Sequence, residues 1–189
     1  MRIIGGDARG RPIRLPRECR IRPTADRVKK SLFDILNPIA GKSFLDLFAG
    51  SGNVGLEALS RGARFSVFVE RDVRLVKAIR MGVAQLGFSE RAEVIDADAE
   101  RGLECLIHRG VRFDILFADP PYDEYWVRKT LQWLEHNDIT TDNGIVILQH
   151  SVREKPEGSQ VQVFVIADQR RYGDTMLSFL HKKDKGKVS

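Results

Sequence analysis

The sequence has little cysteine: only Cys19 and Cys105 occur among 189 residues. Two thiols so far apart along the chain are too few for a cysteine-based metal cluster. A single disulfide is also uncommon in a cytosolic protein. We therefore interpret both cysteines as ordinary thiols and expect no bound metal.

Long hydrophobic runs are also missing. A membrane-spanning helix needs a run of about 18 apolar residues, and none is present. The first residues, Met1 to Asp7, lack the charged and then apolar layout of a signal peptide. We expect a soluble, cytoplasmic protein that does not contact membranes.

The length and the 42% hydrophobic content suit one globular domain with a short appendage, and we expect a monomer. The charge is unevenly spread. Residues 1–30 hold ten Lys and Arg against three Asp and Glu, a net charge of +7, and residues 181–189 add +3. The middle is net acidic, since the whole chain carries +5. We predict a basic arm (1–24), a main domain (25–182) and a basic tail (183–189), which suggests a polyanion at one edge of the protein.

Short apolar runs alternate with amphipathic segments after Lys42, which predicts an α/β fold with a mostly parallel sheet and helices on both faces. The predicted strands are 44–48, 65–70, 92–96, 113–119 and 145–149. The predicted helices are 25–36, 54–60, 72–86, 100–108 and 125–135, with Thr24 and Asp72 as N-caps and Gly87 as a stop. Two later apolar segments, 161–166 and 176–180, leave no room for a helix between them and predict an antiparallel hairpin. Residues 1–21 should form a short hairpin or an extended arm.

A glycine-rich turn follows the first predicted strand, in the segment from Leu45 to Gly55. Gly50 and Gly52 allow a ligand to approach the backbone, and the helix start that follows leaves amide donors available. With Gly55, these residues also satisfy the dinucleotide pattern G-x-G-x-x-G, so the glycines alone leave the ligand open.

Three acidic residues separate the two interpretations. Glu70 ends the second strand and is placed to bind a ribose, as it would in either kind of site. Asp46 lies before the glycines, where its negative charge would attract a cationic group of a ligand and would not favour a pyrophosphate. Asp98 follows the third strand and could accept from an adenine amine. Together they fit S-adenosylmethionine, which has a ribose diol, an adenine amine and a positively charged sulfonium and ammonium. The predicted cofactor-binding set is Asp46, Phe48, Gly50, Gly52, Glu70, Arg71, Asp98, Ala99 and Asp119.

The fourth strand ends in Asp119-Pro120-Pro121-Tyr122. Two consecutive prolines fix φ and remove two amide donors, which makes the loop rigid. An exocyclic amine of a nucleobase is a poor nucleophile, so it must be oriented towards a methyl donor. The Asp119 carboxylate and the Pro120 carbonyl could each accept one N–H, while Tyr122 could stack on the base. We predict that these four residues form the catalytic loop.

The chain resembles the bacterial family of 16S ribosomal RNA guanine-N2 methyltransferases, which are class I S-adenosylmethionine-dependent enzymes. The resemblance covers nearly the whole chain. It rests on the segments 2–6, 22–28, 45–52, 55–62 and 172–175 together with the Asp119 loop. Asn53 is a mild departure, because a small residue is expected after Gly52.

The resemblance implies a seven-stranded Rossmann-like sheet, S-adenosylmethionine as donor, and one guanine of 16S ribosomal RNA, in an assembling small subunit, as target. The basic arm would then bind RNA phosphates. The predicted RNA-binding residues are Arg9, Arg11, Arg14, Arg20, Arg22 and Arg27.

Three alternatives stay open at this point. The same loop could present the amine of adenine, in DNA or RNA, although 189 residues leave no room for a separate target-recognition domain. A nicotinamide-dependent oxidoreductase is favoured only by the glycine pattern. A non-catalytic RNA-binding protein would be expected to have lost Asp119 or Tyr122, and both are present.

Overall fold

The computed structural model describes residues 1–14, 25–121, 124–154 and 163–183. Contacts between residues divide the chain into two compact units, Met1–Cys105 and Leu106–Ser189, which we describe in turn. The predicted boundaries of arm, domain and tail stay a prediction.

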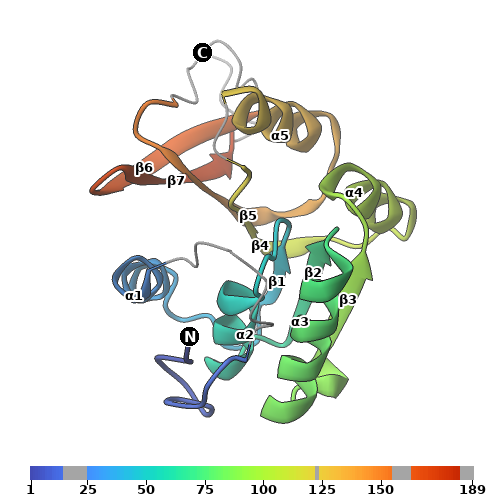
Figure 1. The fold of residues 1–189 in the computed structure, drawn as a ribbon. Coiled ribbons are helices and arrows are strands. Elements are labelled where there is room, and N and C mark those ends of the chain that lie inside the picture. Colours follow the sequence, from blue (N-terminus) through green and yellow to red (C-terminus); the bar gives the residue numbers. More distant parts are fainter. Residues whose placement is uncertain (15–24, 122–123, 155–162, 184–189) are drawn as a thin grey trace. The chain divides into compact units, whose positions relative to one another are not determined.

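The first unit contains three parallel strands in the order β3-β2-β1. Helices α2 and α3 pack against these strands (Figure 1). Its elements are α1 (Asp26–Ile35), β1 (Ser43–Asp46), α2 (Asn53–Ser60), β2 (Phe65–Glu70), α3 (Val73–Leu86), the 3₁₀ turn η1 (Ser89–Arg91) and β3 (Ala92–Asp96). Helix α4 (Ala99–His108) begins in this unit and ends in the next.

Helix α3 shows how the sequence sets local structure. The Asp72 side chain accepts from the backbone N–H of Arg74 at 2.9 Å and caps the helix start. Hydrogen bonds from Arg74 lower the pKa of Asp72 to about 2. Gly87 ends the helix at φ +79°, a conformation that other residues adopt with strain. Both predicted ends of this helix are confirmed.

The second unit contains four strands in the order β4-β5-β7-β6. Strand β4 (Phe113–Ala118) runs parallel to β5 (Thr140–Ser151), whereas β7 (Thr175–Lys182) pairs antiparallel with β5 and with β6 (Phe164–Tyr172). Helix α5 (Glu124–His136) connects β4 to β5. The predicted C-terminal hairpin is confirmed.

The predicted bounds of the first hairpin strand are wrong. The strand runs to Tyr172 instead of ending at Ile166, because its second half pairs with β7 up to Tyr172 opposite Thr175. That half is polar because β6 lies at the edge of the sheet, where its outer side chains are solvated. Hydrophobic alternation in the sequence therefore marks only the first part of this strand.

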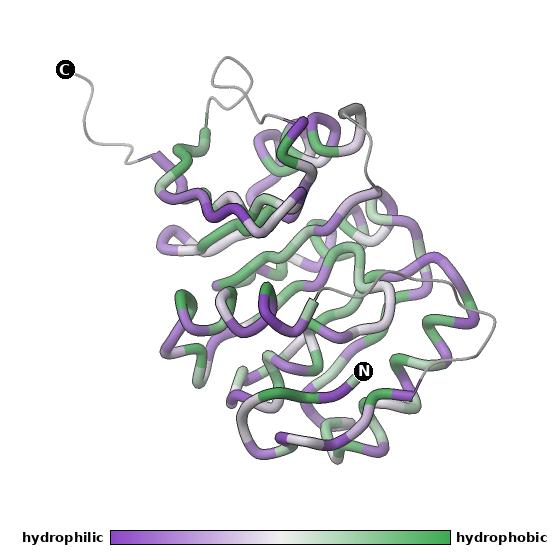
Figure 2. The backbone as a smooth tube through the Cα atoms, turned by 60° about the vertical axis from the view of Figure 1, so that its left-hand side comes forward, coloured by the Kyte–Doolittle hydropathy of each residue, from purple (hydrophilic) through white to green (hydrophobic). Residues whose placement is uncertain are grey.

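The predicted fold class, α/β with parallel strands and an antiparallel C-terminal pair, is confirmed by seven strands in the described part of the chain. The helices change repeatedly between hydrophobic and hydrophilic residues along their length, as amphipathic helices do (Figure 2). Among the described residues, no helix is both long and apolar enough to cross a bilayer.

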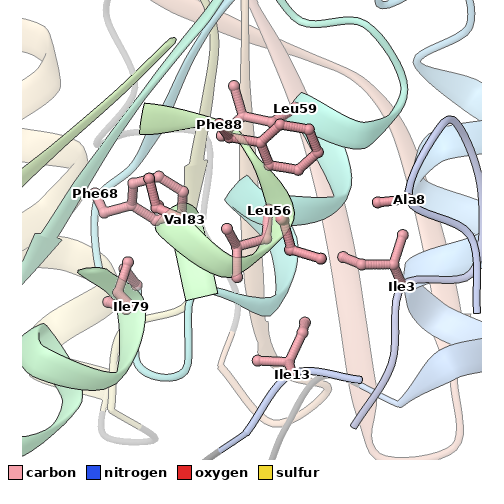
Figure 3. Packing of buried hydrophobic residues seen from close by; sticks show 11 residues of the cluster. Ile3, Ala8, Ile13, Leu56, Leu59, Phe68, Ile79, Val83 and Phe88 are labelled. Atoms are coloured by element: carbon pink, nitrogen blue, oxygen red, sulfur yellow. The ribbon is translucent and has the colours of Figure 1, made fainter. Parts of the chain in front are cut away.

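The N-terminal residues form a small hairpin that belongs to the core of the first unit. Ile3 N–H donates to the Arg11 carbonyl at 3.0 Å, and Gly10 N–H donates to the Ile3 carbonyl at 2.8 Å. Ile3, Ala8 and Ile13 are buried in one cluster with side chains of α2 and α3 (Figure 3). The start of the predicted arm is thus packed, whereas residues 15–24 lie outside the described residues.

A buried ion pair fixes this hairpin and α1 to α2. Lys29 and Glu57 are both fully buried, with Nζ 3.2 Å from Oε2. Lys29 Nζ also donates to the Arg2 carbonyl at 2.9 Å, and Glu57 Oε2 accepts from the Ile4 N–H at 2.8 Å. Burial lowers the pKa of Lys29, while the charge of Glu57 opposes that shift. Glu57 Oε1 also pairs with Arg61 Nε at 2.8 Å, so the buried carboxylate lies between two cations, and Lys29 is the fully buried one.

The predicted cap of α1 is wrong in position. The N-cap residue is Ala25, not Thr24, and it makes no capping side-chain hydrogen bond. Alanine offers no side-chain acceptor, so the start of α1 depends on other contacts. The ion pair of Lys29, in the first turn of α1, is one of them.

We predict that Lys29→Met lowers the free energy of unfolding by about 3 kcal/mol, because it removes the buried cation beside Glu57 and leaves that buried carboxylate with Arg61 as its cation. Urea unfolding measures this change. Lys30→Met is the matched control, since Lys30 pairs with Asp34 on the surface and should cost below about 1 kcal/mol. Equal losses in the two variants would show that the buried pair does not stabilise the fold.

Candidate functional site

The glycine-rich turn lies between β1 and α2 in the first unit. Gly50 has φ +53° and Gly52 has φ +71°, so both lie in the left-handed region that favours glycine. A Cβ at Gly50 would meet nothing closer than 4.0 Å, whereas a Cβ on Gly55 would lie 2.4 Å from the Phe68 ring. The turn thus presents open backbone at Gly50 and packs tightly against β2 at Gly55.

Asp46 ends β1 beneath this turn and is buried. Its Oδ2 accepts from the backbone N–H of Gly55 at 3.0 Å, in the first turn of α2. This bond satisfies one of the amide donors that a helix start leaves open. Asp46 therefore shapes the turn, and its predicted contact with the cationic part of a ligand stays a prediction.

Glu70 ends β2 and holds the turn from the other side. Its Oε2 accepts from the Gly50 N–H at 2.7 Å, and its Oε1 accepts from the Asp72 N–H at 2.8 Å. The side chain is half-buried. The carboxylate therefore fixes Gly50 of the turn and also holds the segment that leads into α3, and its contact with a ribose stays a prediction.

The other predicted cofactor residues follow the same edge of the unit. Asp98 caps the start of α4, where its Oδ1 accepts from the Arg101 N–H at 2.9 Å, and its side chain is 46% exposed. Phe48 is half-buried, Ala99 is buried and Arg71 is exposed. The exposed half of the Asp98 carboxylate can still accept from a ligand amine.

These residues fit the predicted cofactor. The open backbone at Gly50 admits a ligand, and Glu70 and Asp98 place carboxylate oxygens at the ends of two neighbouring strands. Carboxylates suit the hydroxyl and amine donors of S-adenosylmethionine and would repel a pyrophosphate. In the described ranges, no three His, Cys, Asp or Glu residues lie close enough together to hold a metal ion.

Asn53, the departure from the expected small residue, has a defined partner. It is buried at the start of α2, and its Oδ1 accepts from Lys29 Nζ at 2.6 Å. The buried ion pair therefore also contacts the residue next to the glycine turn. Sequence analysis missed Lys29, although its position beside Val28, Leu32 and Phe33 places a lysine on the buried face of a helix.

The predicted catalytic loop belongs to the second unit. Asp119 directly follows β4 and is half-buried, Pro120 is buried and Pro121 is exposed. The Asp119 Oδ2 accepts from Gln149 Nε2 at 2.9 Å. Tyr122 lies outside the described residues, so its predicted stacking role stays a prediction.

Sequence analysis missed Gln149, which is buried at the end of β5. Strands β4 and β5 are parallel with Ala118 opposite Leu148, so Asp119 and Gln149 come next in register. The available signal was a polar residue that directly follows the apolar run 145–148 in this strand. Beside it, burial lowers the pKa of His150, whose Nε2 accepts from the Ser178 hydroxyl at 2.8 Å.

The predicted RNA-binding arginines differ in their surroundings. Arg9, Arg14 and Arg27 are exposed, as phosphate contacts require. Arg11 donates to the carbonyls of Gln85 and Leu86 at the end of α3, which gives it a structural role. Arg20 and Arg22 lie outside the described residues.

Comparisons with known proteins give the family of the chain. Residues 1–181 match the protein family described as Conserved hypothetical protein 95. The chain is 36% identical over 153 residues to Ribosomal RNA small subunit methyltransferase D of Escherichia coli (strain K12), covering 80% of this chain and 75% of that protein. The protein of the same name from Haemophilus influenzae is 35% identical over 158 residues, covering 82% and 81%.

A solved structure shares the fold. The Escherichia coli protein yhhF superposes with a TM-score of 0.84 at 31% identity, covering 97% of this chain and 98% of that one. The similarity in sequence and fold extends over both units. The chain therefore belongs to the Conserved hypothetical protein 95 family, to which its resemblance to ribosomal RNA methyltransferases had pointed.

Proposed function

We propose that this protein transfers a methyl group from S-adenosylmethionine to the exocyclic N2 of one guanine in 16S ribosomal RNA. The observation that carries the proposal is the Asp119 carboxylate, which is held by Gln149 at the start of a double-proline loop. This arrangement suits the orientation of an amine. The names of the relatives indicate the substrate class, which is ribosomal RNA of the small subunit.

The residues of the first unit would bind the donor. S-adenosylmethionine supplies an electrophilic methyl group on a sulfonium. Glu70 would accept from the ribose hydroxyls and Asp98 from the adenine amine, while Gly50 lets the ligand approach the backbone. Asp46 keeps the turn in shape through Gly55 and adds negative charge below it. The chain's part in this half of the reaction is to hold the donor in one orientation.

The second unit would hold the amine. Asp119 and the Pro120 carbonyl each accept one N–H, which directs the nitrogen lone pair away from the ring. When the methyl group passes from sulfur to nitrogen, the S–C bond would break and leave S-adenosylhomocysteine, and the Asp119 carboxylate would stabilise the positive charge that develops on the nitrogen. The proton that is released can pass to this carboxylate or to water. Rate enhancement then comes mainly from orientation and from a fixed negative charge.

The competing functions gain less support. The relatives at about one-third identity are named as ribosomal RNA methyltransferases. A nicotinamide-dependent oxidoreductase is therefore supported only by the glycine pattern. A DNA or RNA adenine-N6 methyltransferase uses the same amine chemistry, so the base must be determined by experiment. Cytoplasmic location and a monomeric state stay predictions.

The first prediction from this proposal concerns the donor. Glu70→Ala should weaken binding of S-adenosylhomocysteine about ten- to a hundredfold, because a charged hydrogen bond to the ligand and the bond to the Gly50 N–H are both lost. Isothermal titration calorimetry measures the affinity. Glu90→Ala, at an exposed glutamate of the same unit, should bind normally. Unchanged affinity in Glu70→Ala would remove Glu70 from the cofactor site.

The second prediction concerns the catalytic loop. Asp119→Ala should lower kcat about a hundredfold or more while most cofactor affinity is retained, because the other predicted cofactor residues still hold the donor and Asp119 is the carboxylate that orients the amine. Single-turnover assays with labelled S-adenosylmethionine measure the rate. Asp114→Ala, in the same strand, is the control and should retain turnover. Near-normal turnover of Asp119→Ala would contradict the proposed role.

The substrate is tested by methyl transfer from the labelled donor to small subunits from cells that lack this activity. Naked 16S ribosomal RNA and duplex DNA are compared in parallel, and nucleoside analysis identifies the product. We expect N2-methylguanosine from RNA and no label in DNA. A product of N6-methyladenosine, or label in DNA, would overturn the proposed base and replace it with the adenine alternative.

A further inference from the structure

The Gln149 side chain donates a hydrogen bond from Nε2 to the Asp119 carboxylate at 2.9 Å. The amide is 4% exposed, at the end of a strand that pairs on both sides, with β4 and with β7. Its neighbour in β7 is Leu177. The pairing with β4 ends at the preceding residue, Leu148, so Gln149 lies where β5 is paired on both sides up to its neighbour and continues against β7 alone. A donor on a strand that is paired in this way holds its acceptor in one place.

The other end of the same amide indicates why a glutamine is present. Within the described part of the chain, Gln149 Oε1 is buried and has no hydrogen-bond partner. A buried acceptor without a donor is unfavourable, and an apolar side chain of the same size would avoid that cost. The Nε2 bond to Asp119 is the compensating contact that the structure shows. The presence of a glutamine at this position is therefore better explained by its hydrogen bond to Asp119 than by packing.

The end of β5 is further fixed on its opposite face. Gln169 Nε2 donates to Ser178 Oγ at 2.9 Å, and the Ser178 hydroxyl donates to His150 Nε2 at 2.8 Å. His150 Nδ1–H then donates to the Ser151 carbonyl at 2.9 Å. Since side chains alternate along a strand, this chain of bonds and the Gln149 contact restrain opposite faces of β5.

We propose that Gln149 is a positioning residue that holds the Asp119 carboxylate in the orientation needed to accept from the substrate amine. The inference rests on the proposed function of Asp119. A carboxylate offers about four acceptor positions, so the bond to Gln149 at Oδ2 leaves capacity for a substrate N–H. The bond also limits rotation of the carboxylate. Without it, the carboxylate would have to be oriented anew in each catalytic cycle.

Gln149→Met tests the inference, because methionine keeps a similar volume and lacks the donor. We expect kcat to fall about ten- to a hundredfold, as for loss of a hydrogen bond to a charged group, with the affinity for S-adenosylhomocysteine and the KM for small subunits little changed. Gln149→Asn is a second variant, since its shorter amide cannot span the 2.9 Å bond, and it should lose kcat similarly.

Gln169→Met is the matched control. It removes another side-chain amide from the same sheet, but that amide donates to Ser178 and not to Asp119. It should therefore lower kcat much less than Gln149→Met does, because it loosens the opposite face of β5 but leaves the bond between Gln149 and Asp119 in place. Urea unfolding of each variant confirms folding, and Gln149→Met should be at least as stable as Gln169→Met because it also removes a buried acceptor without a partner.

A double variant separates this inference from the proposed function. In an Asp119→Ala background, Gln149→Met should have no further effect on single-turnover rates, because two residues that act through one contact are not additive. If Asp119→Ala itself turns over normally, the proposed function fails. If Asp119→Ala is inactive, two results would refute the role of Gln149 without affecting the proposed function. One is a wild-type kcat in folded Gln149→Met, and the other is a double variant in which Gln149→Met adds its full effect to that of Asp119→Ala.

Discussion

The structure of the first unit depends on two carboxylates that bind the backbone of one turn. Asp46 and Glu70 stand at the ends of neighbouring parallel strands and accept from the amides of Gly55 and Gly50. Amides at a helix start need acceptors, and a turn built on left-handed glycines has little conformational preference of its own. The strand ends therefore impose the shape of the turn, and a ligand meets a surface that is already formed.

The buried pair of Lys29 and Glu57 extends this constraint to the N-terminus. Through it, the hairpin of residues 1–13, helix α1 and helix α2 share one network, which also includes Asn53 beside the glycine turn. Such a pair stabilises little in itself, but the loss of Lys29 would leave the buried charge of Glu57 compensated by Arg61 alone. The stability of α2, and of the glycine turn that precedes it, therefore depends on the correct placement of the N-terminal hairpin.

Much of the fold could be predicted because local signals and tertiary structure agree. The limits of β2, β3 and α3 follow from apolar periodicity and from the cap and stop at Asp72 and Gly87. The polar edge strand β6 and the partners of Lys29, Asn53 and Gln149 could not be predicted, because each depends on a contact between residues far apart in the sequence. The glycines and acids of the candidate site were predicted from residue type and position, but the bonds of Asp46 and Glu70 to the backbone of the turn could be described only from coordinates.

The most direct test of the central claim is a crystal structure of the protein with S-adenosylhomocysteine. The account predicts ribose hydroxyls within hydrogen-bond distance of the Glu70 carboxylate, with the Glu70 bond to Gly50 and the Asp46 bond to Gly55 unchanged from those described above. A ligand bound away from this turn, or a turn that must break both carboxylate bonds to admit it, would contradict the account.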